Sequence, residues 1–320
     1  MFQGLPNLTR LEILRDRAEM LARVRSFFNE KRVVEVDCPL VSSSASVDAH
    51  IDLIPCLDPS GSYRYLHSSP EYGMKRLLSE GMGDIYQLAH VFRQGDVGRK
   101  HNPEFLMAEW YRVGVSFSRM IEETLEFMRL FLGDLPASFI SYREALKTYT
   151  GIDYVHATPE ELFNYIKANQ VETYTGLLEE GKDALLNLIL GLFVEPHLGK
   201  NELTALTHYP STQAALAQTK KIKDETVAER FEIYYQGVEL ANGYHELAKA
   251  GEQRLRLEEA NNQRLNMGKE ALPIDENFLK ALEKGLPDCC GVAVGVDRLM
   301  MLRHKAETIS DVIPFNWAQA

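Results

Sequence analysis

The alternation of apolar and polar residues divides the chain into helices and strands from its first segment onward. Residues 11–28 carry an apolar side chain every three or four positions, which predicts an amphipathic helix of about five turns. Further helices are expected at residues 70–79, 116–132, from Thr158 onward, 182–194, 250–268 and 297–305. Strands are expected at residues 32–37, 64–69, 84–93, 104–114, 203–209, 229–235, 238–242 and 291–296.

The predicted strands come in adjacent pairs joined by loops, without a regular strand–helix–strand alternation. This order favours an α+β fold, in which helices pack on an antiparallel sheet. No internal repeat, low-complexity tract or obvious linker interrupts the sequence. We therefore expect residues 1–320 to form one continuous domain, with a helical insertion at about 116–200.

Composition and charge narrow the class of protein. The chain has 320 residues, of which 45% are apolar and 25% charged, and this mixture is typical of a globular protein with a large core. The net charge of −11 argues against broad electrostatic wrapping of nucleic acid. Four cysteines without CxxC spacing fit a reducing cytoplasm. The longest apolar stretch, 184–194, is shorter than the roughly 18 residues of a membrane span, so we expect a cytoplasmic protein with no membrane partner.

Basic and amide side chains gather in the loop after the strand that ends at Arg93. Arg99, Lys100, His101 and Asn102 follow within the loop, and arginine offers a planar fork for phosphate oxygens. The motifs GxxxxGK[ST], GxGxxG after a strand, HExxH and GxSxG are absent. A polyphosphate-binding loop and a solvated hairpin tip fit these residues equally well.

The strand after this loop has two distinct faces. Phe105, Met107, Glu109 and Tyr111 share one face, because side chains alternate along a strand, and the opposite face is expected to lie on the core. An acid with two aromatic rings suits a cleft that binds a purine and an amine. An ordinary polar outer face explains the same pattern.

A hairpin in residues 229–247 brings acids together. A two-residue turn at 236–237 would pair Tyr234 with Glu239, and Glu232 would share their face. Two adjacent carboxylates repel each other unless a cation lies between them, and oxygen ligands alone favour Mg²⁺. Taken in isolation, a solvent-exposed face is the simpler explanation.

Glu246 falls on the wrong face of this hairpin if the strand is regular. It lies seven residues after Glu239, and an odd spacing reverses the side. A β-bulge at Asn242 and Gly243 would return it to the face of Glu239, since glycine commonly marks such bulges.

The segment GVAVGVDR, residues 291–298, has one nearly bare strand face. Gly291, Ala293 and Gly295 alternate along it, so a flat ligand could approach the backbone closely. Arg298 opens the next helix, where the free N–H groups favour phosphate. Close packing of a helix on a glycine-rich strand is the competing explanation.

Taken together and in their order along the chain, these segments resemble the three signature motifs of class II aminoacyl-tRNA synthetases. The first helix with the strand ending at Pro39 resembles motif 1, FR…RKHNPEF resembles motif 2, and GVAVGVDR resembles the pattern GxGxGxxR of motif 3. HSSPEYGMKRL and FEIYYQGVELANGYHEL are similar to the lysyl-tRNA synthetase branch. The resemblance extends from about Thr9 to Phe315 and implies an antiparallel sheet flanked by helices.

The start of the sequence points to one subfamily. Lysyl-tRNA synthetases of this class carry an N-terminal OB-fold that binds the anticodon, whereas the motif 1 helix here begins about ten residues in. A core without an anticodon-binding domain resembles the elongation factor P β-lysine ligases, in which Ala replaces a Gly at the place of Ala293. The resemblance implies adenylation of (R)-β-lysine or lysine with ATP and Mg²⁺, elongation factor P as acceptor, a homodimer through motif 1, and no role for tRNA.

The resemblance also implies roles for individual residues. ATP would be bound by Arg93, Gln94, Gly95, Arg99, Lys100, His101, Asn102, Phe105, Glu239, Leu240, Gly295 and Arg298, with Arg93 and Arg298 catalytic and Phe105 stacked on adenine. The amino substrate would be bound by Ser69, Pro70, Glu71, Glu109, Tyr111, Asn242, Glu246 and Ala293. Glu232 and Glu239 would hold Mg²⁺. A diamino acid carries two cations, so several carboxylates in one site are physically reasonable.

One position departs from the family pattern. Motif 2 normally reads F-R-x-E, and Gly95 stands at the place of the acid, followed by Asp96. Either Asp96 substitutes through a shifted loop or backbone groups alone contact the base. The departure leaves open a non-catalytic regulatory paralogue, beside a truncated lysyl-tRNA synthetase that uses α-lysine with tRNA or another carrier.

Overall fold

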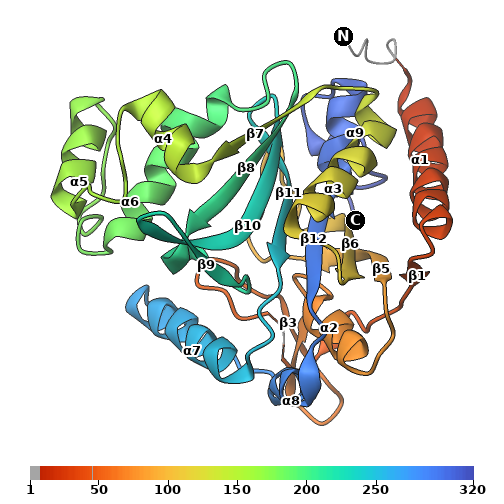
Figure 1. The fold of residues 1–320 in the computed structure, drawn as a ribbon. Coiled ribbons are helices and arrows are strands. Elements are labelled where there is room, and N and C mark those ends of the chain that lie inside the picture. The colour runs from red at the N-terminus through yellow and green to blue at the C-terminus, as the bar shows by residue number, and fades with distance from the viewer. Residues whose placement is uncertain (1–7, 45) are drawn as a thin grey trace. The chain divides into compact units, whose positions relative to one another are not determined.

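The computed structural model describes residues 8–44 and 46–320, and this part of the chain forms two compact units. The smaller unit is Leu135–His245, and the larger unit consists of the described residues on either side of it. Figure 1 labels most helices and strands of both units.

The larger unit is built on four strands in the order β1-β5-β6-β12. Their bounds are Val34–Glu35, Ile85–Phe92, Glu104–Val113 and Cys289–Gly295. The short β1 runs parallel to β5, while the β5–β6 and β6–β12 pairs are antiparallel. A second, three-stranded sheet has the order β2-β4-β3, with bounds Val41–Ser42, Tyr63–Leu66 and Pro55–Leu57.

Helices of the larger unit bury aromatic side chains against these strands. They are α1 (Arg10–Glu30), α2 (Glu71–Ser79), α3 (Phe117–Leu132), α7 (Ala250–Asn266), α8 (Glu276–Gly285), α9 (Val296–His304) and the 3₁₀ turn Ile309–Asp311. Phe28 of α1 stacks on Tyr86 of β5 with ring centroids 4.1 Å apart, and its edge meets Trp110 of β6. The Trp110 indole also donates to Glu123 of α3 (3.1 Å), so these elements share one core.

Two ion pairs fasten α1 to α9. Arg17 Nη1 lies 2.6 Å from Asp297 Oδ1, and both side chains are buried. The other Asp297 oxygen accepts from the Leu106 N–H of β6 (2.9 Å). Arg303 donates two bonds to Asp16 (2.7 and 2.8 Å). The first turn of α9 is thereby fixed to a helix and a strand that are distant in sequence.

The smaller unit contains five strands that pair in a mostly antiparallel arrangement. Its strands are β7 (Ala137–Ser141), β8 (Leu203–Pro210), β9 (Thr219–Ile222), β10 (Glu225–Tyr235) and β11 (Val238–His245). They run in the order β7-β8-β10-β11 with β9 beside β10, and only the β7–β8 pair is parallel.

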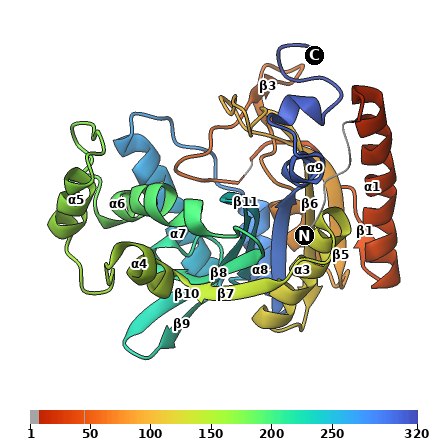
Figure 2. The ribbon, with the colours of Figure 1, turned by 90° about the horizontal axis from the view of Figure 1, so that it is seen from above.

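Helices α4 (Tyr142–Thr150), α5 (Pro159–Ala168) and α6 (Lys182–Ile189) lie together beside these strands, as Figure 2 shows. The π-helical turn Leu190–Val194 and the 3₁₀ turns Glu195–His197 and Ser211–Gln213 complete the unit. Their apolar side chains form a single buried core with Leu206 and Tyr209 of β8.

The expected α+β fold, with helices on a mostly antiparallel sheet, is confirmed. The expected helices and strands are present, most within two residues of the predicted bounds, and Thr158 and Glu161 form the expected capping box. Six further helices and strands, β2, β3, β7, α4, β9 and α8, were not expected. In the described part of the chain, no helix is long and apolar enough to cross a membrane.

The helical insertion expected at about 116–200 differs at both ends from the smaller unit, Leu135–His245, and its bounds stay a prediction. We expected residues 116–200, but α3 belongs to the larger unit, because Phe127 packs against Phe27 of α1 and Trp110 of β6. The smaller unit also continues past residue 200 through strands β8 to β11. That the two units act as one catalytic domain stays a prediction.

Candidate functional site

Three glutamates of the larger unit meet in a buried group that we call the acidic cluster: Glu71, Glu109 and Glu246. Their exposed fractions are 9%, 2% and 1%. Ser69 Oγ donates to Glu109 Oε2 (2.7 Å) and accepts from the Glu71 N–H (2.9 Å), so it connects α2 with β6. An ordinary solvent-exposed face, the alternative considered for Glu109, is therefore wrong.

Lys75 lies within this cluster. Its Nζ lies 2.6 Å from Glu71 Oε1 and 2.5 Å from Glu246 Oε2, and the side chain is fully buried. Burial alone would lower the pKa of Lys75, but the Glu246 and Glu71 carboxylates outweigh burial and raise it well above its ordinary value. Lys75 is therefore a permanent cation held between two carboxylates.

Glu109 is held by neutral donors. Besides Ser69, the Tyr111 hydroxyl donates to Glu109 Oε1 (2.7 Å). Burial, reinforced by the charge of Glu71 and that of Glu246, raises the pKa of Glu109 from 4.5 to about 8. At pH 7 this carboxyl is largely protonated until a cation reaches it. An ammonium group beside Glu109 would favour its ionised form.

Gly291 of strand β12 leaves room for the side chains of Tyr111 and Glu246. Gly291 lies opposite Tyr111, and a Cβ on Gly291 would stand 2.3 Å from Tyr111 Cε1 and 2.5 Å from Glu246 Oε1. The space at Gly291 is therefore filled by protein, contrary to the expected approach of a flat ligand. At Gly295 a Cβ would meet only Arg298 Cδ, at 3.9 Å, so ligand contact there stays a prediction.

The basic loop joins β5 to β6 as expected, and Arg93 stands at its start. The Arg93 guanidinium lies over the Phe105 ring, with Cζ 5.0 Å from the ring centroid. Its Nε is buried and has no hydrogen-bond partner among the described residues. A buried donor without an acceptor costs free energy, which fits a position that receives an anionic ligand.

Gly95 has a conformational reason to be glycine. Its φ is +82°, a region that side-chain-bearing residues rarely adopt, and a Cβ there would meet nothing within 4 Å. The Gly95 carbonyl accepts from the Val97 N–H (2.8 Å), and the Gln94 N–H donates to the Asp52 carbonyl (2.8 Å). The glycine therefore shapes a tight turn that fixes the start of the loop.

Arg298 meets the basic loop at the beginning of α9. Its Nη2 lies 2.8 Å from His101 Nε2. Burial and the Arg298 charge lower the pKa of the His101 imidazole, which keeps the ring neutral near pH 7. These two predicted ATP ligands therefore come together at one end of the loop.

Other predicted ATP ligands are placed differently. Arg99 pairs with Glu307 at 3.2 Å, and both side chains are exposed, as is Lys100. Asn102 is buried: its amide donates to the Glu104 carbonyl (2.6 Å) and accepts from the Trp317 N–H (2.9 Å). Asn102 thus anchors the C-terminal segment, a structural role that the sequence did not indicate.

In the smaller unit, the β10–β11 hairpin has the expected turn. Tyr235 pairs with Val238 and Tyr234 with Glu239, which confirms the two-residue connection. The expected bulge is present but in a different place. Ile233 pairs with Ala241, so Leu240 is the extra residue, whereas we expected the bulge at 242–243.

The bulge at Leu240 has a consequence for the face of β11. It reverses the side of every later residue in the strand, so Asn242 pairs with Glu232 and joins its face. The Asn242 amide donates to Tyr244 (2.9 Å), while its Oδ1 is buried without a partner in the described structure. Asn242 therefore retains an acceptor for a ligand.

Glu232 is buried and held by two strong donors. Arg230 Nη2 and the Tyr234 hydroxyl each lie 2.5 Å from one of its oxygens. Glu239 lies opposite Tyr234, and burial together with the Glu232 charge and, more weakly, the Glu239 charge raises the Tyr234 pKa well above its ordinary value. Glu232, Tyr234 and Glu239 therefore share one face, and the solvent-exposed alternative is wrong for Glu232.

The carboxylate oxygens of Glu232 and Glu239 on this hairpin are the type of ligand that Mg²⁺ prefers. Carboxylates are hard oxygen ligands, and Mg²⁺ binds through one or two of them while keeping water and phosphate oxygens. Among the described residues there is no group of three or more His, Cys, Asp or Glu that could hold a metal by itself. Each oxygen of Glu232 is already held by Arg230 or Tyr234, so binding of Mg²⁺ by Glu232 and Glu239 would require one of these donors to be displaced and stays a prediction.

A comparison with known proteins assigns the chain to a family. The family model described as tRNA synthetases class II (D, K and N) matches residues 5–319. The chain belongs to this family. Curated relatives cover almost all of it: one from Klebsiella pneumoniae strain 342 is 43% identical over 97% of this chain and 95% of its own length. One from Haemophilus influenzae is 44% identical over 93% of both chains, and one from Salmonella gallinarum is 42% identical over 98% and 95%. All three are named elongation factor P–(R)-beta-lysine ligase.

Within this class II fold, two important residues were missed by the sequence reasoning. Lys75 stands four residues after Glu71 on α2, a spacing that places both on one helix face and could have indicated the pair. Asp297 adjoins Arg298 in motif 3, but its partners Arg17 and Leu106 are too distant in sequence to be found from spacing.

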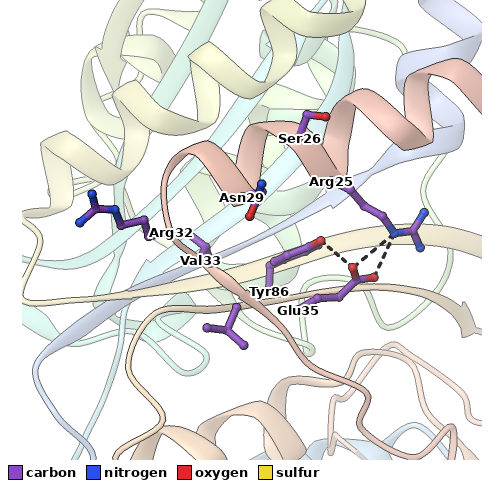
Figure 3. Close-up of a pocket in the computed structure, with 8 residues that line it drawn as sticks. Arg25, Ser26, Asn29, Arg32, Val33, Glu35 and Tyr86 are labelled. Atoms are coloured by element: carbon purple, nitrogen blue, oxygen red, sulfur yellow. Dashed lines mark hydrogen bonds and ion pairs between the residues drawn. The ribbon is translucent and has the colours of Figure 1, made fainter.

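Two pockets of the larger unit lie away from the acidic cluster. The first, about 630 Å³, is lined by α1, β1 and β5, and Figure 3 shows Glu35 between Arg25 and the Tyr86 hydroxyl. The second, about 280 Å³, is lined mainly by apolar groups, including Val97 and Trp317 beside the turn at Gly95. Ser69 and Glu71 border neither pocket, and Pro70 is buried at the start of α2.

Proposed function

We propose that this chain is an ATP-dependent ligase that adenylates (R)-β-lysine and transfers it to a lysine side chain of elongation factor P. The observation that carries the proposal is the buried acidic cluster, Glu71, Glu109 and Glu246, with one internal cation, Lys75. Burying several carboxylates is costly unless cations compensate them. A substrate with two ammonium groups supplies that compensation.

The relatives support both the substrate and the acceptor. Proteins that are 42–44% identical and cover at least 93% of this chain have names that specify (R)-beta-lysine and elongation factor P. Ala293, which pairs with Glu109, agrees with the ligases at this position of motif 3. Family membership also supports ATP as the co-substrate.

The chemistry follows from Arg93 and Arg298. The substrate carboxylate attacks the α-phosphorus of ATP, the new P–O bond forms, and pyrophosphate leaves. Negative charge grows on the phosphate oxygens, and fixed guanidinium donors stabilise it. The lysine amine of the acceptor then attacks the acyl carbon, AMP leaves, and the amine gives up its proton as the amide forms.

Positioning supplies the remaining catalytic effect. Glu71, Glu109 and Glu246 would hold the two amines so that the carboxylate reaches ATP. Glu232 and Glu239 would hold Mg²⁺, which neutralises phosphate charge when bound. We also propose that the protein is cytoplasmic and dimerises through α1, which borders the pocket of Figure 3 and carries exposed Leu11.

The test is a direct comparison of acceptors. Purified protein is incubated with ATP and radiolabelled (R)-β-lysine or α-lysine, with either elongation factor P or tRNA. We expect label on elongation factor P, more from β-lysine than from α-lysine, and none on tRNA. Label on tRNA alone would support a truncated tRNA synthetase. ATP binding without pyrophosphate exchange for either isomer would indicate a non-catalytic paralogue.

Substrate binding should strengthen as pH rises toward 8. Because the pKa of Glu109 is raised to about 8, ionising it for an ammonium ligand costs free energy at lower pH. The KM for the amino substrate should fall by up to about tenfold per pH unit below pH 8 and then level off. Pyrophosphate exchange between pH 6.5 and 8.5 measures this dependence.

The control for the pH profile is Glu109→Gln, which removes the titrating group. Its KM should be higher at pH 8 and nearly independent of pH. A wild-type profile that persists in this variant would show that another group titrates. In the free protein, stability linked to Glu109 is fully present below pH 4.5 and is lost as pH rises through about 8, which thermal unfolding can follow separately.

A further inference from the structure

We infer that Lys75 is a built-in counter-ion that sets the charge of the acidic cluster to match two ammonium groups and orients Glu71 and Glu246 toward them. The inference rests on the proposed function, because it explains how that site distinguishes a diamino acid. Lys75 is a positioning residue: its contacts are with the carboxylates.

The geometry of Lys75 supports an electrostatic role. Its side chain has no exposed surface, and its Nζ lies within 2.6 Å of an oxygen on Glu71 and 2.5 Å of an oxygen on Glu246. Each carboxylate has a second oxygen, so the lysine fixes the orientation of both groups without using all their acceptors. Glu71 comes from α2 and Glu246 follows β11, so one cation ties together two distant segments.

The net charge of the acidic cluster with Lys75 explains a preference for a ligand with two ammonium groups. Three ionised glutamates carry −3, and Lys75 reduces this to −2, which two ammonium groups neutralise. An amino acid with one ammonium group would leave Glu109 protonated, so it would forgo the second ion pair of the acidic cluster and bind less favourably. Without Lys75 the same two ammonium groups would leave an excess charge of −1.

The other groups around Nζ do not change this count. Tyr72 on α2, Tyr111 on β6 and Cys289 on β12 have pKa values raised by burial and nearby acids, so they stay neutral at pH 7. Phe278 of α8 places its ring centroid 5.9 Å from Nζ. Asp275, at the N-cap of α8, uses its carboxylate to accept from two N–H groups of that helix.

The main variant is Lys75→Met, which keeps the length of the side chain and removes its charge. We expect at least a tenfold higher KM for (R)-β-lysine in pyrophosphate exchange, with the KM for ATP within twofold of wild type. Lys220→Met, which removes a partly exposed pair with Glu229 in the smaller unit, is the matched control and should leave both constants unchanged. A Lys75→Met variant with wild-type KM for the amino substrate would overturn the inference.

Chemical rescue separates charge from shape. Lys75→Ala removes the equivalent of n-propylammonium, so adding that ion should lower the KM for (R)-β-lysine again. The isosteric 1-propanol fills the same volume without charge and should not. Equal rescue by both compounds would show that Lys75 acts by packing alone.

A further measurement does not depend on activity. The loss in melting temperature of Lys75→Met relative to wild type should grow from pH 6 to pH 9, because the cluster then ionises without its cation. The double variant Lys75→Met/Glu246→Gln restores the charge of −2, and its pH dependence should return to that of wild type. If the melting temperature of Lys75→Met depends on pH as that of wild type does, the inference is overturned. This test holds even if the protein activates no amino acid. A failure of pyrophosphate exchange, by contrast, would count against the proposed function.

Discussion

Arg93→Ala is expected to lower the rate of ATP–pyrophosphate exchange by roughly 10²–10³-fold, the usual loss when one preorganised donor to a developing oxyanion is removed. The Arg93 guanidinium is held over Phe105, and its Nε is buried without a partner among the described residues. The side chain is therefore positioned before any anion arrives, so the loss should fall mainly on kcat.

Two further variants make the Arg93 result specific. Arg93→Lys keeps the charge but loses the planar fork, and we expect only partial recovery. Arg119→Ala removes an exposed arginine that pairs with Glu122 and Glu126 on α3, and it should leave exchange unchanged. Near-normal exchange in Arg93→Ala would show that the motif 2 assignment is wrong.

Asp297→Ala is expected to lower the free energy of unfolding by about 3–5 kcal/mol, the range for breaking a buried ion pair on one side. The carboxylate forms an ion pair with Arg17, with Nη1 2.6 Å from Oδ1, and its Oδ2 accepts from the Leu106 N–H at 2.9 Å. Its removal leaves the buried Arg17 guanidinium without its counter-ion and the Leu106 N–H without its acceptor. Urea unfolding at pH 7 measures the change.

The partner substitution tests whether the ion pair is the cause. In Arg17→Met/Asp297→Ala no buried charge is left uncompensated, so part of the stability should return. If the double variant is as unstable as the sum of the single variants, the two residues are not coupled. Asp58→Ala, which affects a largely exposed loop, should cost less than Asp297→Ala.

Regular periodicity explains what could be predicted from the sequence. The turn at 236–237 fixed the pairing of Tyr234 with Glu239, because a two-residue connection leaves one register. The alternation along β6 correctly placed Glu109 and Tyr111 on one face, and the Tyr111 hydroxyl bonds to that carboxylate. Both inferences use only neighbours within one hairpin or strand.

Features that depend on distant contacts could not be predicted in the same way. A bulge can occur at any of several positions, and no local pattern indicated Leu240 rather than 242–243. The solvent-exposed alternatives for Glu109 and Glu232 could be rejected only once burial was known. The space at Gly291 is taken by Tyr111 and Glu246, which no local pattern shows.

The turn at Gly95 bears on how this chain could have diverged from other class II enzymes. A glutamate at that position would have to adopt a φ near +82°, which costs about 1–2 kcal/mol for an ordinary L-residue. Restoring the family's usual acid at this position would therefore carry this conformational cost, unless the turn after the Gln94–Asp52 hydrogen bond also changed. The conformation of this loop therefore favours glycine over an acid at residue 95.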